Sequence, residues 1–275
     1  MIVFPHCKIN LGLQILSNRE DGFHNIEAVF FPIPWYDVLE IICIDKSSTP
    51  AIHFTQSGMA IPGDENICEK TFHLLKNDFP ALPSVAMHLH KNIPVGAGLG
   101  GGSADAAFAL LAINQLAGLQ LSTTQLQTYA EKLGSDCSFF LQKQPCIVSG
   151  KGEICQPVSL SLPSYKIVLV NPGIHIPTAE AYAHVQLVQH KKNIREIINY
   201  PVQDWKHSLK NDFETGIFEK FPAIAEVKKE MYNQNAVYAL MSGSGSTVFG
   251  IFEKNQNPHF SFPENYLLRT FDFGA

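Results

Sequence analysis

Five glycines fall within the seven residues from Gly96 to Gly102, and this run leads directly into an alanine-rich segment. The segment from Ser103 to Leu116 has high helix propensity and is apolar nearly all round, which predicts a buried helix that Gly118 ends. Glycines let backbone N–H groups converge on a ligand, and a helix start adds unpaired N–H donors and a positive dipole end. The run therefore predicts a loop that cradles phosphate groups. A tight turn with positive φ would explain one or two of the glycines, but hardly five before a helix.

Two common phosphate-binding loops fit this run poorly. A P-loop requires a lysine directly after its last glycine, and no lysine follows the run before Lys132. The Gly-x-Gly-x-x-Gly pattern of dinucleotide-binding folds is formally met. However, its ribose-binding acid should lie about 20 residues further on, and no Asp or Glu occurs between Asp105 and Glu131. A dinucleotide-dependent oxidoreductase is therefore the weaker alternative.

Charge and hydropathy oppose several classes of protein. The formal net charge is −5, charged residues make up 16% of the chain, and no five like charges are adjacent, which opposes a nucleic-acid-binding module. The longest apolar stretch, Ala106 to Ile113, is far short of the ~20 residues that a membrane-spanning helix needs. No secretory leader is visible, and the six cysteines include no Cys-x-x-Cys pair. We therefore expect a cytoplasmic protein with reduced thiols and no membrane partner.

Strand and helix patterns are mixed along the chain rather than strictly alternating, which favours an α+β fold over a doubly wound sheet. Residue alternation and β-rich composition predict strands at 9–15, 38–44, 85–90, 167–170, 237–241 and 248–252. Helical spacing and capping residues predict helices at 66–76, 122–134, 137–141, 178–190, 192–198 and 222–235. The Pro- and Ser-containing stretch at 157–163 predicts two domains, 1–157 and 158–275.

The glycine run and its flanks, Pro94 to Ala104, resemble the phosphate-binding motif of the GHMP kinases, which include galactokinase, homoserine kinase, mevalonate kinase and phosphomevalonate kinase. Two further segments lie in the order of that family's other motifs. Lys8 to Leu11 resembles the first motif, and Met241 to Thr247 resembles the third, a glycine turn beside the nucleotide site. The resemblance implies a two-domain GHMP kinase fold, with a ribosomal protein S5 domain 2-like N-terminal domain and a ferredoxin-like C-terminal domain.

Four more segments indicate a branch of this family. They are Arg19 to His24, Leu133 to Phe140, Asn171 to Thr178 and Asn211 to Glu214. Together they resemble the branch whose acceptor is 4-diphosphocytidyl-2-C-methyl-D-erythritol, which ATP phosphorylates on its 2-hydroxyl in the non-mevalonate isoprenoid route. Mevalonate-like or homoserine-like acceptors remain alternatives.

The resemblance implies a reacting pair of charged residues. Asp136 would be the general base that accepts the proton of the acceptor hydroxyl, and Lys8 would hydrogen-bond Asp136 and steady the negative charge near that oxygen. Read from the residues alone, Asp136 is well placed as the N-cap of the helix at 137–141, and both roles can hold together. A lysine on an N-terminal strand is usually solvated, whereas the flanking Cys7 and Ile9 favour a functional Lys8.

The resemblance also implies the ATP site. Its phosphates would be held by the loop, and Ser103 would offer its hydroxyl to a phosphate or to Mg²⁺. Asn66 and Lys91 would lie on the adenine or ribose side, from their position only. The predicted ATP-binding set is Asn66, Lys91, Pro94, Val95, Gly96, Ala97, Gly98, Leu99, Gly100, Gly101, Gly102, Ser103 and Ala104.

The cytidine end of the acceptor would need an aromatic platform, because base stacking on aromatic side chains contributes roughly 1–3 kcal/mol. By resemblance, Phe23 and Tyr182 occupy the stacking positions, His24 reads the cytosine, and Asn10 contacts substrate. Phe23 stands where tyrosine is common, which keeps the aromatic face and loses a hydroxyl. Asn10 lies two residues after Lys8, so period-2 geometry places the two side chains on one face of a strand.

Overall fold

The computed structural model describes residues 1–44, 50–63, 65–142, 144–185 and 187–273. The chain forms two compact units that are discontinuous in sequence. Unit 1 contains Met1–Cys7, Pro34–Val95 and Gly100–Lys143, and unit 2 contains Lys8–Ile33, Gly96–Leu99 and Gln144–Ala275. The predicted domains are consecutive instead. The difference arises because the long strands β2 (His6–Asn18) and β3 (His24–Tyr36) each contribute residues to both units.

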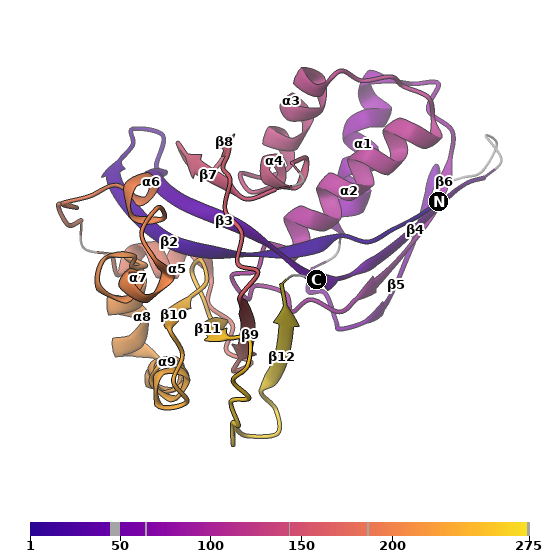
Figure 1. The fold of residues 1–275 in the computed structure, drawn as a ribbon. Helices are drawn as coiled ribbons and strands as arrows, with labels where there is room; N and C mark the ends of the chain where they lie inside the picture. The colour runs from indigo at the N-terminus through magenta and orange to yellow at the C-terminus, as the bar shows by residue number, and fades with distance from the viewer. Residues whose placement is uncertain (45–49, 64, 143, 186, 274–275) are drawn as a thin grey trace. The chain divides into compact units, whose positions relative to one another are not determined.

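Unit 1 is a four-stranded sheet with helices on one face (Figure 1). The strand order is β1 (Ile2–Val3), β4 (Val38–Cys43), β6 (Val85–Lys91) and β5 (Ile52–Gly58), with β5 parallel to β6 and the other pairs antiparallel. The helices are α1 (Ile67–Asp78), α2 (Gly101–Leu116), α3 (Thr123–Leu133) and α4 (Cys137–Phe140). Alternation along β6 points Val85, Met87 and Leu89 into the core, as the sequence predicts.

Helix α2 is at the centre of the unit 1 core. The core cluster contains Ala106, Ala109, Leu110 and Ala112 of α2 together with Leu39 and Ile41 of β4, Phe72 of α1 and Ala130 of α3. A helix that is apolar nearly all round can be buried in this way, because each of its faces has an apolar partner. Helix α2 begins at Gly101, two residues before the predicted start, and Gly118 follows its end with a positive φ.

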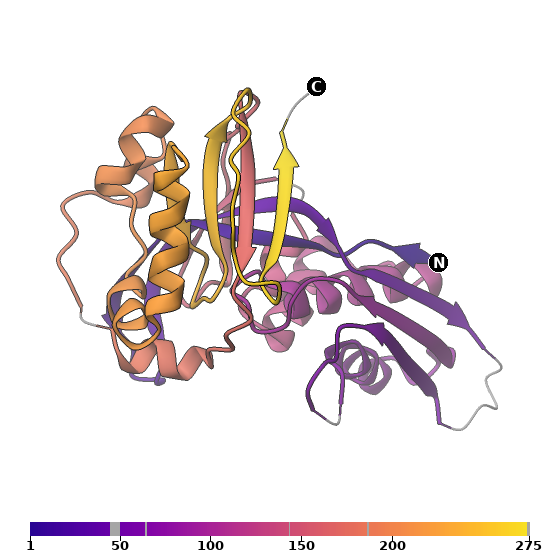
Figure 2. The same ribbon diagram turned by 90° about the horizontal axis from the view of Figure 1, so that it is seen from below.

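Unit 2 contains the other two sheets. One has the order β2, β3, β7 (Cys146–Ser149) and β8 (Ile154–Pro157), and the other is antiparallel with the order β10 (Tyr238–Met241), β11 (Val248–Glu253), β9 (Tyr165–Asn171) and β12 (Leu267–Asp272). The helices are α5 (Thr178–Ala183), α6 (Ile194–Ile197), α7 (Val202–Ser208), α8 (Glu214–Lys220) and α9 (Pro222–Asn233). Helix α9 runs along the second sheet (Figure 2) and buries Ile224, Val227 and Met231.

Most predicted elements are confirmed, and the errors have local causes. The helix predicted at 178–190 ends at Ala183, and the one at 192–198 is reduced to Ile194–Ile197. Strand β3 was not predicted, because Pro32 and Pro34 interrupt its pattern. Among the described residues, no helix is both long and apolar enough to cross a membrane.

Candidate active site

The segment Gly96 to Gly102 is called the glycine loop below. Three of its glycines have a left-handed backbone, with φ of +64° at Gly96, +77° at Gly98 and +69° at Gly100. L side chains rarely adopt this conformation. A Cβ on Gly98 would lie 1.9 Å from the carbonyl oxygen of Ser242, and one on Gly96 would lie 2.5 Å from the ring of His175. Backbone conformation therefore explains three of the five glycines, and close approach makes the requirement at Gly98 stricter.

Gly102 has no such requirement. It is exposed in the first turn of α2, its φ is not positive, and a Cβ there would meet no described atom within 4 Å beyond its chain neighbours and the nearby backbone of α2. Gly100, the N-cap residue, has no side chain to cap the helix, and the first turn carries no acidic residue. The first turn of α2 therefore has open space beside Gly102 and N–H groups that no capping side chain satisfies, which fits the approach of an anionic ligand.

Replacing Gly102 by alanine is expected to separate binding from folding. Alanine is the better helix former, so the free energy of unfolding should rise by roughly 0.5–1 kcal/mol. A methyl group in the open space should raise the KM for ATP by about tenfold, because phosphate groups could no longer approach the backbone closely. Urea unfolding and initial-rate kinetics measure the two effects. An unchanged KM would show that phosphates do not approach this turn.

Ser103 lies half-buried in the same turn, and its hydroxyl hydrogen-bonds the thiol of Cys137, the first residue of α4. Burial raises the pKa of Cys137 to about 12, so this thiol stays protonated at neutral pH. The contact brings the first turn of α2 beside the start of α4, where Asp136 precedes Cys137. Two predicted site residues, Ser103 and Asp136, are therefore neighbours within unit 1.

Asp136 occupies the N-cap position of α4, but its side chain makes no capping hydrogen bond. The prediction of its position is confirmed, and the prediction that its carboxylate caps this helix is wrong. Residue 136 itself has helical backbone angles, φ −78° and ψ −13°, whereas a capping residue is usually extended. The capping interaction therefore does not explain why an aspartate stands at the start of α4.

In unit 2, Lys8 and Asn10 lie side by side on β2, as period-2 geometry predicts. Lys8 is 3% exposed, and its Nζ donates to Asn10 Oδ1 at 2.5 Å and to the Gly98 carbonyl at 3.3 Å. Its ammonium also lies 4.4 Å from the centre of the Phe30 ring. Lys8 is thus a buried cation beside the glycine loop. The hydrogen bond predicted between Lys8 and Asp136 joins residues of different units and stays a prediction.

The segment Met241 to Thr247, which resembles the third family motif, also contacts the glycine loop. Ser242 Oγ donates to the Gly98 carbonyl at 2.8 Å and accepts from the Asn10 backbone N–H at 3.2 Å. The Lys8 backbone N–H donates to the Leu99 carbonyl at 2.9 Å. Within unit 2, segments more than 200 residues apart in the chain are therefore tied to the glycine loop by backbone and hydroxyl bonds.

Lys91 is buried in unit 1 between two carboxylates. Its Nζ lies 2.5 Å from Asp37 Oδ2 and 2.6 Å from Asp105 Oδ2, and all three side chains are at most 2% exposed. Burial raises the pKa of Asp105 to about 7; Lys91 opposes this rise, and Asp37 adds to it. The sequence did not indicate either acid. The ammonium of Lys91 is engaged in this cluster, so its predicted contact with ATP stays a prediction.

Asn66 has a clear local role as the N-cap of α1. Its Oδ1 accepts the Cys68 N–H at 2.8 Å, and its own N–H donates to Glu69 at 3.0 Å, which completes a capping box. Asn66 also lines a pocket of about 260 Å³ in unit 1, with Phe54, Ile61 and Pro62 among the apolar lining. Its predicted contact with ATP stays a prediction.

The structure brings together two of the residues predicted to bind the acceptor. The rings of His24 and Tyr182 are stacked, with centroids 4.3 Å apart and planes 13° apart. Phe213, which was not among the predicted binding residues, packs edge-on against Tyr182, with ring centroids 4.8 Å apart. Phe23 is exposed, and the Lys151 ammonium lies 4.9 Å from its ring. Unit 2 therefore contains a partly exposed stacked pair, His24 and Tyr182, and Phe213 packs against the tyrosine of this pair.

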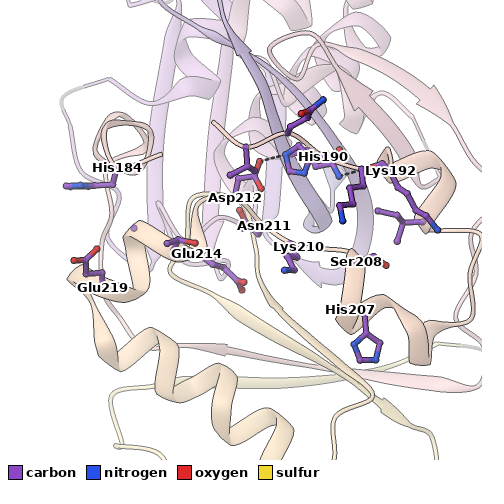
Figure 3. Close-up of a pocket in the computed structure, with 17 residues that line it drawn as sticks. His184, His190, Lys192, His207, Ser208, Lys210, Asn211, Asp212, Glu214 and Glu219 are labelled. Atoms are coloured by element: carbon purple, nitrogen blue, oxygen red, sulfur yellow. Dashed lines mark hydrogen bonds and ion pairs between the residues drawn. The ribbon is translucent and has the colours of Figure 1, made fainter. Parts of the chain in front are cut away.

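Asn211, Asp212 and Glu214 line a pocket of about 640 Å³ in unit 2 (Figure 3). The hydrogen bonds of Asn211 and Asp212 give both residues a structural role. Asp212 accepts the Ile15 N–H at 2.7 Å and pairs with His190 at 2.9 Å, and Asn211 donates to the carbonyls of Met241 and Gly243, both at 2.8 Å. The segment Asn211 to Glu214 thus holds β2 and the glycine turn at 241–247.

Comparison with known proteins decides the family. Residues 66–144 match the family model "GHMP kinases N terminal domain", and residues 191–259 match "GHMP kinases C terminal". Over 98% of this chain and 100% of the relative, the chain is 47% identical to 4-diphosphocytidyl-2-C-methyl-D-erythritol kinase of Azobacteroides pseudotrichonymphae. The chain belongs to the 4-diphosphocytidyl-2-C-methyl-D-erythritol kinase family.

Other members and structures agree with this placement. The kinase of this family from Cytophaga hutchinsonii is 48% identical over 96% of each chain. A crystal structure of 4-(cytidine 5'-diphospho)-2C-methyl-D-erythritol kinase has a TM-score of 0.78 and 31% identity, covering 91% of this chain and 90% of that one. A mevalonate kinase structure with a TM-score of 0.70 and 12% identity, covering all of both chains, supports the fold alone. The chain is a GHMP kinase with an α+β fold, and this family assignment replaces the alternative of a dinucleotide-dependent oxidoreductase.

The residues present fit a magnesium ion that arrives with the nucleotide. Among the described residues, no group of three or more His, Cys, Asp or Glu side chains is placed to hold a metal ion. Mg²⁺ commonly takes only one or two protein ligands and completes its shell with phosphates and water. The Ser103 hydroxyl has two lone pairs and one hydrogen, so it can bond Cys137 and still offer a lone pair to a cation.

Proposed function

We propose that this kinase transfers the γ-phosphate of ATP to the 2-hydroxyl of 4-diphosphocytidyl-2-C-methyl-D-erythritol, the acceptor in its relatives' name. GHMP kinases use ATP as the phosphoryl donor, which the two family models support. The observation that supports ATP as the donor is the first turn of α2, where no side chain caps the helix and the space beside Gly102 is open. The cytoplasmic location and the absence of a nucleic-acid partner stay predictions.

Phosphoryl transfer needs positioning and charge stabilisation more than covalent work by the protein. The N–H groups of the loop and of the first turn of α2 would hold the phosphates, with a helix dipole whose positive end faces them. Mg²⁺, held by those phosphates and the Ser103 hydroxyl, would neutralise part of their charge. Since backbone groups do most of this binding, a protein with a net charge of −5 needs no basic patch to bind ATP.

The acceptor oxygen would attack the γ-phosphorus, the bond to the bridging oxygen would break, and ADP would leave. Asp136 would take the proton of the hydroxyl as the new bond forms. Lys8 would stabilise the negative charge on the attacking oxygen, which its burial favours because electrostatic interactions are stronger in a dry site. Asn10 would fix the direction of the Lys8 ammonium through the hydrogen bond between them.

The cytidine end would be held by the aromatic residues of unit 2. Tyr182 would supply a stacking face, stiffened by Phe213, and His24 would offer a ring nitrogen to the base edge. Phe23 is exposed enough to supply a second face. This arrangement accounts for a cytidine group on the acceptor, which mevalonate and homoserine lack.

Replacing Tyr182 by alanine is expected to raise the KM for the acceptor by about 5- to 150-fold, the range that corresponds to losing one stacked base. His24→Ala should raise the same KM, because it removes the ring nitrogen offered to the base edge. The KM for ATP should stay unchanged. Phe262→Ala is the matched control, because Phe262 stacks on Tyr266 in the same unit and is not assigned to the site. A rise confined to the KM for ATP would show that the two substrates are assigned to the wrong residues.

A panel of acceptors tests the proposed function. ADP release would be followed with ATP and either 4-diphosphocytidyl-2-C-methyl-D-erythritol, mevalonate or homoserine. We expect turnover with the first compound only. Turnover with mevalonate or homoserine at a comparable kcat/KM would assign the chain a different acceptor.

A further inference from the structure

The charge cluster of Asp37, Lys91 and Asp105 joins three elements of unit 1. Asp37 lies between β3 and β4, Lys91 is the last residue of β6, and Asp105 is on α2. The ammonium is within 2.6 Å of both carboxylates. The exposed fractions are 0% for Asp37 and 2% for each of the other two, so water screens none of these charges. The cluster connects the end of β6 to α2 across the glycine loop.

Both ends of the glycine loop touch this cluster. Before the loop, Asp37 Oδ1 accepts the backbone N–H groups of Asn92 at 2.6 Å and Ile93 at 2.8 Å. After the loop, the Lys91 Nζ lies 3.1 Å from the place that a Cβ on Gly101 would occupy. A single carboxylate thus fixes the chain that enters the loop, and the ammonium it binds packs against the first residue of α2.

Stability alone does not account for these three charges. Removing charges from water is unfavourable, and apolar residues of similar volume in place of a buried ion pair are often neutral or stabilising. Here two carboxylates face one ammonium, and Asp105 Oδ1 is a buried oxygen with no hydrogen-bond partner in the described part of the chain. Charged groups do give fixed directions and short distances, which apolar contacts do not.

We propose that Asp37, Lys91 and Asp105 are positioning residues for phosphoryl transfer, which hold the two ends of the glycine loop at a fixed separation. They act through the backbone at 92–93 and through α2, so that the N–H groups of the first turn of α2 are held in position for the phosphates of ATP. Lys91 then contributes by placing the loop and not by touching the nucleotide. This inference rests on the proposed function only in taking ATP as the ligand of the loop.

A triple variant separates positioning from stability. Asp37→Asn, Lys91→Met and Asp105→Leu together remove every charge and leave an amide oxygen at residue 37 for the two backbone N–H groups. We expect an unfolding temperature at or above that of the wild type. The dissociation constant of a non-hydrolysable ATP analogue, measured by calorimetry at 25 °C, should rise about tenfold or more. The dissociation constant of the acceptor should not change.

Two single variants keep the test decisive if the triple variant does not fold. Asp105→Asn keeps an oxygen for the Lys91 ammonium and should bind the analogue like the wild type, whereas Asp105→Ala should bind it about tenfold more weakly. Lys229→Met is the control, because it removes an exposed ion pair with Glu226 on α9 and should change neither measurement.

Wild-type affinity in the folded triple variant, or in Asp105→Ala, would overturn the inference and make the cluster purely structural. That result is distinct from a failure of the proposed function. A wild type that does not bind the analogue would contradict ATP as the donor, and a wild type that binds it but phosphorylates another acceptor would contradict only the proposed acceptor.

Discussion

Replacing Asp136 by asparagine is expected to lower kcat by about 10²- to 10⁴-fold, the contribution of a positioned general base. Asparagine has nearly the same shape but cannot take the proton of the acceptor hydroxyl. The fold should tolerate the change, because the Asp136 side chain makes no capping hydrogen bond to α4. The loss should therefore appear in kcat, with little change in the KM for ATP or in the unfolding temperature.

Steady-state ADP release with both substrates saturating measures this loss. Asp204→Asn is the matched control, since Asp204 is an exposed carboxylate in the first turn of another short helix, α7, and should leave kcat unchanged. A kcat of Asp136→Asn equal to that of the wild type would remove Asp136 from the mechanism.

Replacing Gly98 by alanine is the substitution with the largest expected effect on stability. The left-handed backbone, with φ at +77°, is unfavourable for alanine by roughly 1–2 kcal/mol. In addition, the new Cβ would lie 1.9 Å from the Ser242 carbonyl oxygen, so the backbone on one side must move, at roughly 1–3 kcal/mol. We expect the free energy of unfolding to fall by about 2–5 kcal/mol.

Moving the backbone at Gly98 would also disturb Lys8, which we propose stabilises the attacking oxygen. The Gly98 carbonyl accepts hydrogen bonds from both Lys8 and Ser242, so phosphoryl transfer should be lost together with stability. Urea unfolding and ADP release measure the two effects. Gly102→Ala is the matched control for stability alone, because it makes the same chemical change at a position where no neighbouring segment opposes a Cβ. Equal stability in the two variants would contradict the geometry of the loop.

Local sequence patterns predicted the loop and the helices around the proposed ATP site. The glycine run, the alanine-rich helix after it and the Ser122 capping box of α3 each depend on residues that are close in sequence. For that reason their positions were predicted with small errors; α2, for example, begins at Gly101, two residues before the predicted start. The roles of Lys8 and Asp136 came from family resemblance, because neither a lone lysine nor a lone aspartate indicates a site.

The surroundings of Lys91 could not be predicted in the same way. Its partners Asp37 and Asp105 are 54 and 14 residues away, and no local pattern marks a lysine that will be buried between two carboxylates. The stacking of His24 on Tyr182 and the packing of Phe213 behind it also depend on tertiary structure. An aromatic residue in a sequence is more often core than platform, and only the fold distinguishes the two.

The position of the transferred phosphate tests the central claim most directly. The enzyme would be incubated with ATP and 4-diphosphocytidyl-2-C-methyl-D-erythritol, and the product examined by ³¹P NMR with and without proton decoupling. Carbon 2 of this acceptor carries a methyl group and no hydrogen. We therefore predict a new phosphate monoester signal that proton coupling does not split, appearing as ADP forms. A monoester signal split by protons, or ADP formation without any new monoester, would contradict transfer to the 2-hydroxyl.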